Sequence, residues 1–197
     1  MTVPLIFRHG VAEAAFIASV AVWAVFEFVM RVRQRLRAGR PATPDGSAIV
    51  LVPCLAAAVI ATQVLGRRGR LPWPGGLVWP VVAGLVLIVA GIGLRAWSIA
   101  ALGRLFQYQI QIQPGHQVVT GGPYRYVRHP SYTGIALVLT GIALASDDVW
   151  SLVAVAALGG AGLLVRIRAE ERQLAQALGG EYERFAAGRK RLVPGVW

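Results

Sequence analysis

Residues 131–165 read SYTGIALVLTGIALASDDVWSLVAVAALGGAGLLV, and this stretch decides the class of fold. Two apolar runs, at 131–145 and 149–165, are separated by only three residues. A helix of about 17 residues spans about 26 Å, close to the ~30 Å hydrocarbon core of a bilayer, whereas about 15 residues span about 22 Å. The pattern predicts a tight helical hairpin in a membrane, with one end of the shorter arm inside protein.

Three further apolar runs precede the hairpin, at 14–30, 48–65 and 78–94. We expect the first run to be a membrane span and not a signal peptide, because Glu13 precedes it, Glu27 lies near its end and no small-residue cleavage site follows. The sequence therefore predicts an all-α integral membrane protein with about five transmembrane helices. Residues 1–94 are expected to hold the three N-terminal helices, and residues 95–197 a functional core.

The composition excludes other classes of protein. Hydrophobic residues make up 56% of the 197 residues and charged residues only 15%, which is untypical of disordered or soluble chains. The net charge is +11, but 19 of the 20 basic residues are arginines scattered between apolar runs, so nucleic acid is not an expected partner. Cys54 is the single cysteine and forms no disulfide within the chain.

The distribution of arginines predicts the orientation in the membrane. Four arginines lie within 31–37, directly after the first run, and mark that loop as cytoplasmic. Segments 31–47, 104–130 and 166–197 then share the cytoplasmic face and hold 15 of the 20 basic residues. Trp73, Trp79 and Trp150 would lie at the outer interface, where indole rings are favoured, although Arg67, Arg68 and Arg70 would lie there too.

A polar stretch at 107–132 carries most of the candidate functional groups. Pro130 suits the first turn of a helix, which places His129 at a helix N-terminus. Such an end favours an anion, and Arg128 adds a positive charge. Two interpretations of this stretch stay open: a ligand pocket, and a basic loop that contacts lipid headgroups. His116 and His129 lack the further ligands that a metal site needs, so no metal is expected.

Two pairs of charged residues add to the candidate functional groups. Arg166 and Glu170 are four residues apart and share a helix face, and the hairpin brings them to the end where His129 enters. A pocket at the cytoplasmic membrane edge follows. Glu27 lies within the first apolar run and Arg95 directly follows the third, where unpaired charges are costly. We predict that the two pair or that Arg95 faces a tunnel for a substrate; snorkelling to the interface is the alternative.

The polar stretch and the later helix resemble the isoprenylcysteine carboxyl methyltransferase family of integral-membrane enzymes that use S-adenosyl-L-methionine. The resemblance rests on the block HQVVTGGPYRYVRHPSYTG at 116–134, together with Arg166-x-x-x-Glu170-Glu171 and Gly179-x-Glu181-Tyr182. It covers roughly residues 95–197. The N-terminal half is similar only in being hydrophobic.

The resemblance implies an activity and a site. It implies methyl transfer from S-adenosyl-L-methionine to a lipophilic acceptor, most simply a carboxylate, with Arg166 as the residue that contacts the substrate. The implied cofactor-binding residues are Gln109, His116, Gln117, Val118, Val119, Tyr124, His129, Pro130, Ser131, Tyr132 and Glu170. Transfer to an ionised carboxylate needs positioning more than a base, which is consistent with the absence of a His–Asp pair in the motif.

The acceptor stays open at this point. The chain is shorter than eukaryotic members of the family, so another apolar acid is as plausible as a prenylated cysteine. Phospholipid N-methyltransferases share a similar tyrosine–arginine–histidine–proline region, which keeps lipid amines as an alternative, and a non-catalytic membrane binding protein on the same fold is another. The expected partners are a lipophilic or lipidated substrate and membrane lipid. The oligomeric state and the role of the arginine-rich loop 31–40 do not follow from the sequence.

Overall fold

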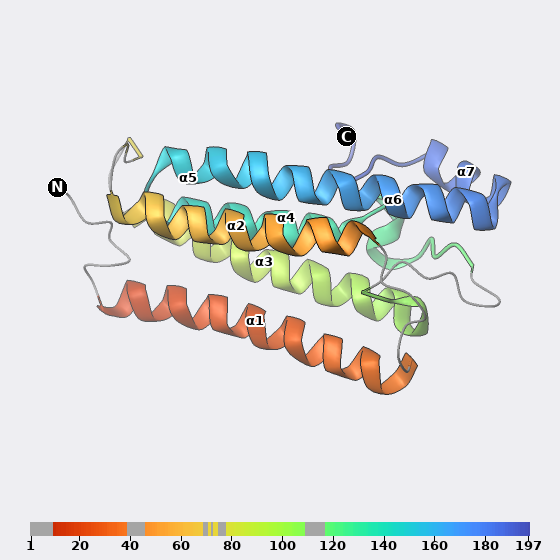
Figure 1. The fold of residues 1–197 in the computed structure, drawn as a ribbon, viewed down its shortest axis with the longest axis horizontal. Coiled ribbons are helices and arrows are strands. Elements are labelled where there is room, and N and C mark those ends of the chain that lie inside the picture. Colours follow the sequence, from red (N-terminus) through yellow and green to blue (C-terminus); the bar gives the residue numbers. More distant parts are fainter. Residues whose placement is uncertain (1–9, 39–45, 69–70, 72, 75–77, 109–116) are drawn as a thin grey trace.

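The computed structural model describes residues 10–38, 46–68, 71, 73–74, 78–108 and 117–197, and the described residues are almost entirely helical. The long helices run back and forth along one direction (Figure 1). Their bounds are α1 (Gly10–Ala38), α2 (Gly46–Arg68), α3 (Val78–Leu102), α4 (Pro130–Ala145), and α5 (Val149–Ala154), which continues through a π-helical turn (Val155–Gly159) into α6 (Gly160–Leu178). A short helix, α7 (Gly180–Ala187), follows. The predicted all-α architecture is confirmed.

Within the described residues, four helices are long and apolar enough to cross a membrane, and α4 is a shorter apolar helix. The four spans are 14–34, 46–65, 78–105 and 149–178. With α4 they correspond to the five predicted runs, although the helices extend beyond them by several residues. The predicted hairpin is also confirmed, because α4 ends at Ala145 and α5 begins at Val149.

Helix α4 lies at the centre of the bundle. One apolar cluster joins it to α1 and α3 through Phe16, Ile88 and Ile142. A second cluster joins it to α2 and to the helix formed by α5 and α6, through residues such as Leu139 and Leu163. Both ends of α4 are buried, at Pro130 and at Ala145. The sequence predicts that one end of this short helix lies inside protein; in the structure both ends do, and longer helices pack around it.

Glycines allow α3 and α4 to pack backbone against backbone. Gly84 faces Gly141, and Gly91 faces Gly134. A Cβ atom placed on Gly91 would lie 2.6 Å from the carbonyl oxygen of Gly134, and one on Gly84 would lie 2.6 Å from that of Gly141. Small residues at membrane helix crossings permit such close approach. This contact fixes the relative position of the two helices that carry Arg95 and the residues after His129.

The turn between α4 and α5 is polar but buried. The carboxylate of Asp148 accepts hydrogen bonds from the backbone N–H of Ser151 at 2.9 Å and of Leu71 at 3.2 Å. The first of these is a helix N-cap, which satisfies an N–H group at the start of α5. Asp147 accepts a hydrogen bond from the backbone N–H of Trp73 at 3.3 Å. Because burial outweighs that bond, the pKa of Asp147 is raised.

Candidate active site

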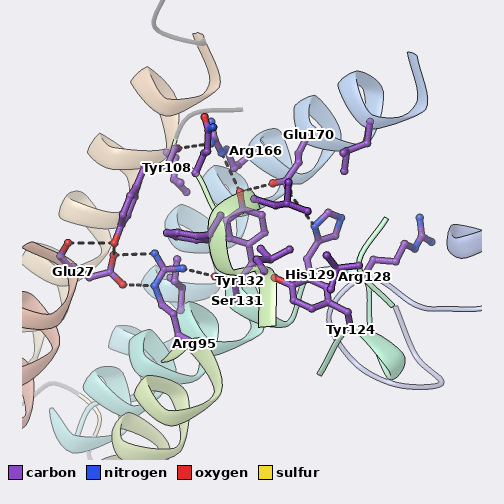
Figure 2. Close-up of a pocket in the computed structure, with 18 of the residues that line it drawn as sticks. Glu27, Arg95, Tyr108, Tyr124, Arg128, His129, Ser131, Tyr132, Arg166 and Glu170 are labelled. Carbon is purple, nitrogen blue, oxygen red and sulfur yellow. Dashed lines mark hydrogen bonds and ion pairs between the residues drawn. The ribbon is translucent and has the colours of Figure 1, made fainter. Parts of the chain in front are cut away.

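A cavity of about 390 Å³ opens at the end of the bundle where α4 begins and α6 ends. Two regions of different character form its wall. Apolar side chains from α1 and α2 line one region, including Trp23, Leu51 and Leu55. Polar and aromatic side chains from α3, α4, α6 and the segments between them line the other (Figure 2). An amphipathic guest, with an apolar part and a polar end, therefore fits its chemistry.

Arg166 occupies the inner wall of the cavity. Only 2% of the residue is exposed, and its guanidinium donates to three oxygens: the Tyr132 hydroxyl at 3.1 Å, the Ser47 hydroxyl at 2.8 Å and the Tyr108 carbonyl at 2.6 Å. The Tyr132 hydroxyl in turn donates to a carboxylate oxygen of Glu170 at 2.6 Å (Figure 2). Tyr132 therefore links the guanidinium to the carboxylate, and the cluster holds both in one orientation.

His129 is the N-cap residue of α4, as the sequence predicts. Its ring is buried and lies 3.3 Å from a carboxylate oxygen of Glu171 through Nε2, and 4.0 Å from Glu170 through Nδ1. The backbone also holds it, because the His129 N–H donates to the carbonyl of Arg191 at 3.0 Å. The C-terminal segment thus fixes the loop that carries His129.

Arg128 does not offer a free charge to a guest at this helix end. Its guanidinium donates to Glu171 at 2.8 Å and to the Arg189 carbonyl at 2.9 Å. Arg191 binds the same carboxylate at 2.8 Å. Glu171 therefore neutralises the arginine that the sequence suggested as an anion contact.

Glu27 and Arg95 pair, which confirms the first of the two predicted alternatives. The two residues make a bidentate ion pair between α1 and α3, with Arg95 Nη2 2.9 Å from Glu27 Oε2 (Figure 2). Tyr108 donates to the same carboxylate at 2.9 Å, and Arg95 donates to the Ser131 hydroxyl at 2.6 Å. All four residues line the cavity. The pair therefore belongs to the site and joins α1 to α4.

Two tyrosines on the loop side of the cavity stay protonated. Burial, and then the nearby Glu170 carboxylate, raise the pKa of Tyr124 well above its usual range. Burial also raises the pKa of Tyr182, with Glu171 as the next contribution. Both phenols therefore present hydrogen-bond donors, not anions, to whatever lies beside them.

Most of the predicted site residues line one cavity: Gln117, Val118, Val119, Tyr124, His129, Ser131, Tyr132, Arg166 and Glu170. Pro130 is fully buried in the first turn of α4, where it shapes the helix start. Gln109 and His116 lie outside the described residues.

The sequence did not predict the apolar region of the cavity wall. Trp23, Leu51 and Leu55 come from helices whose sequence shows only hydrophobicity, and no periodic signal separates a cavity-lining side chain from a lipid-facing one there. It also missed Leu174 and Leu178 as lining residues. Their spacing of four from Glu170 places them on the same face of α6, and that signal could have found them.

Residues 83–176 match the sequence model of the isoprenylcysteine carboxyl methyltransferase (ICMT) family. The ICMT match extends from α3 to α6 and includes Arg95, His129, Arg166 and Glu170. It leaves out Glu27. The resemblance that the sequence motifs predicted is therefore confirmed.

Named relatives agree with the match. The chain is 33% identical over 105 residues to a probable protein-S-isoprenylcysteine O-methyltransferase of Oryza sativa subsp. indica, which covers 52% of this chain and 55% of that protein. It is 34% identical over 120 residues to protein-S-isoprenylcysteine O-methyltransferase B of Arabidopsis thaliana, covering 60% and 59%. With the Homo sapiens protein-S-isoprenylcysteine O-methyltransferase it shares 36% over 66 residues, covering 32% and 23%. The matched region spans little more than half of the plant relatives.

Proposed function

We propose that this protein is a multi-pass membrane methyltransferase that transfers a methyl group from S-adenosyl-L-methionine to the carboxylate of a lipophilic acceptor. The observation that carries the proposal is the Arg166–Tyr132–Glu170 cluster, which lies where the polar and apolar regions of one cavity meet. A fixed cation is placed to hold an acceptor carboxylate, and a carboxylate beside it can hold the cationic end of a cofactor.

The chemistry of the polar wall fits S-adenosyl-L-methionine. Glu170 is half-buried, and it can accept from an ammonium or a ribose diol. His129 and the buried phenol of Tyr124 are donors suited to a carboxylate and to the edge of a purine. When bound, the cofactor would supply an electrophilic methyl group on a sulfonium.

The residues of the chain contribute positioning. Because the acceptor carboxylate is already ionised at neutral pH, no base is needed to remove a proton. Arg166 aligns the carboxylate, Tyr132 and Glu170 hold Arg166 in place, and the apolar wall from α1 and α2 receives the hydrophobic part of the acceptor. Such alignment can supply several kcal/mol of the barrier reduction. The distribution of arginines supports a cytoplasmic location for this end of the bundle and for cofactor entry.

The test separates binding from turnover in the purified full chain. Calorimetry with S-adenosylhomocysteine is expected to show micromolar binding, which Glu170→Gln weakens and the exposed control Glu183→Gln leaves unchanged. Transfer of radiolabelled methyl to a lipid extract should fall at least about a hundredfold in Arg166→Ala, while S-adenosylhomocysteine still binds. The exposed variant Arg184→Ala serves as its control.

The product decides between acceptors. A methyl group released by mild base is an ester and supports a carboxylate acceptor. A base-stable N-methyl lipid would replace this proposal with an amine acceptor. Absence of S-adenosylhomocysteine binding in both detergent and lipid would refute methyl transfer altogether.

A further inference from the structure

A second cavity, of about 660 Å³, lies against a different face of α6. Its charged lining consists of Arg128, Arg168, Arg172, Arg191, Glu171 and Glu183. On α6, the residues of the proposed active site are Arg166 and Glu170. Arg168 follows Arg166 by two positions, and Arg172 follows Glu170 by two. This spacing places Arg168 and Arg172 on another side of the helix. Tyr132, Arg166 and Glu170 do not line this cavity, although Arg128 and Tyr182 line both cavities.

The charges in this cavity are unevenly paired. Glu171 is bound by both Arg128 and Arg191, so two guanidinium groups share one carboxylate. Among the described residues, neither Arg168 nor Arg172 has a carboxylate at ion-pair distance, and both are exposed. Arg172 uses only its Nε, which donates to the carbonyl of Arg168 at 3.1 Å. Four arginines face two glutamates, and the excess charge is positive.

A buried donor points to a ligand at the same place. Tyr182 lines this cavity as well as the first one, only 5% of the residue is exposed, and its hydroxyl has no hydrogen-bond partner among the described residues. Burying a hydroxyl without a partner costs free energy. A phenol is protonated at neutral pH, so the Tyr182 hydroxyl can donate to an anion beside it.

The position of the cavity relative to the membrane indicates which kind of anion it would bind. Val165 also lines it, is 40% exposed and precedes Arg168 by one turn of the helix that crosses the bilayer. Arg172 follows on the same side one turn later. An apolar residue at the membrane, followed by two exposed arginines, matches an acyl chain followed by a phosphate.

We propose that this cavity binds the phosphate of an anionic phospholipid headgroup, with Arg168 and Arg172 as its charged contacts and the Tyr182 hydroxyl as a neutral donor. Two arginines near an anionic surface contribute about 2 kcal/mol together, which corresponds to about a thirtyfold change in affinity. The site does not depend on methyl transfer, and binding can be measured without cofactor or acceptor.

Native mass spectrometry of the purified full chain measures the site directly. Dioleoylphosphatidylglycerol is titrated against dioleoylphosphatidylcholine in one detergent. The wild-type chain is expected to prefer the phosphatidylglycerol by about tenfold or more. Arg168→Gln/Arg172→Gln should lose about thirtyfold in affinity for it, and Tyr182→Phe a few-fold.

The control keeps total charge constant. Arg33→Gln/Arg184→Gln removes two exposed arginines outside the cavity, and Arg184 makes the same bond to the carbonyl four residues earlier that Arg172 makes. This variant should bind like the wild type. Equal loss in both double variants, or equal binding of the two lipids, would overturn the proposal. Displacement of the lipid by millimolar inorganic phosphate would also overturn it, because the site would then recognise soluble phosphate.

Discussion

Substitution of Gly91 by alanine tests how closely α3 and α4 must approach. The added Cβ atom would lie 2.6 Å from the carbonyl oxygen of Gly134, 2.8 Å from Val138 Cγ2 and 2.9 Å from the Val138 nitrogen. Two of these three atoms belong to the backbone, so rotation of a side chain cannot relieve the contact. The helices have to separate by several tenths of an ångström, in a region whose residues are buried.

The expected change in the free energy of unfolding is the difference between two opposing effects. Overpacking of this kind costs about 1–3 kcal/mol, whereas alanine in place of glycine stabilises a helix by about 0.5–1 kcal/mol. At the middle of these ranges Gly91→Ala should destabilise the fold by about 1 kcal/mol, and at most by about 2.5 kcal/mol; the middle value lowers Tm by about 2–5 °C for a chain of this size. Gly93 is the matched control: it lies in the same helix, and a Cβ atom there meets nothing within 4 Å. Gly93→Ala should leave Tm unchanged or raise it.

Cys54 provides the assay. It is the single cysteine and is half-buried, with its Cβ atom 2.7 Å from a Cβ built at Gly162 on α6. A maleimide dye that fluoresces on reaction therefore reports thermal unfolding of the α2–α6 contact in detergent. If Gly91→Ala melts at or above the temperature of Gly93→Ala, the close approach of α3 and α4 is not what stabilises the bundle, and the reasoning fails.

Three further variants probe other parts of the structure. Glu27→Gln should lower the free energy of unfolding by about 3–5 kcal/mol, seen as a lower Tm, because it leaves the buried Arg95 charge uncompensated. The double variant with Arg95→Gln should recover part of this stability. No recovery would contradict the ion-pair argument. Asp148→Ala should cost about 2–3 kcal/mol by the same measurement, since two backbone N–H groups lose their acceptor, and Asp148→Asn should be milder. Tyr132→Phe should reduce methyl transfer more than about tenfold while lowering Tm only slightly, because it disconnects Arg166 from Glu170; unchanged turnover would remove Tyr132 from the proposed mechanism.

The helices were predictable from sequence because hydrophobicity and length suffice for membrane spans. The hairpin turn was predictable as well, since only three residues separate its arms. The burial of Asp147 and Asp148 was not, because it depends on Leu71 and Trp73, which lie more than seventy residues earlier in the sequence. Local pattern carries no information about such a contact.

The residues of the candidate site also fall into those that the sequence predicts and those that it does not. His129, Tyr132 and Glu170 lie in motifs whose spacing alone brings them together once a hairpin is assumed. The apolar wall from α1 and α2 depends on which helix faces contact each other, and a uniformly hydrophobic helix does not specify that. Arg128 shows a third case. Its pairing with Glu171 depends on a C-terminal segment whose sequence gives no helix or strand signal.

That C-terminal segment sets the order in which the site can form. The backbone of Arg128 and His129 donates to the carbonyls of Lys190 and Arg191, and a single parallel bridge joins Val127 to Lys190. During synthesis, these carbonyls leave the ribosome only after every helix of the bundle has been made. The helices can therefore insert and pack while the His129 loop still lacks its partner, and the His129 end of the cavity is completed after them. A nascent chain held before residue 190 should fold its bundle and yet lack a formed His129 loop.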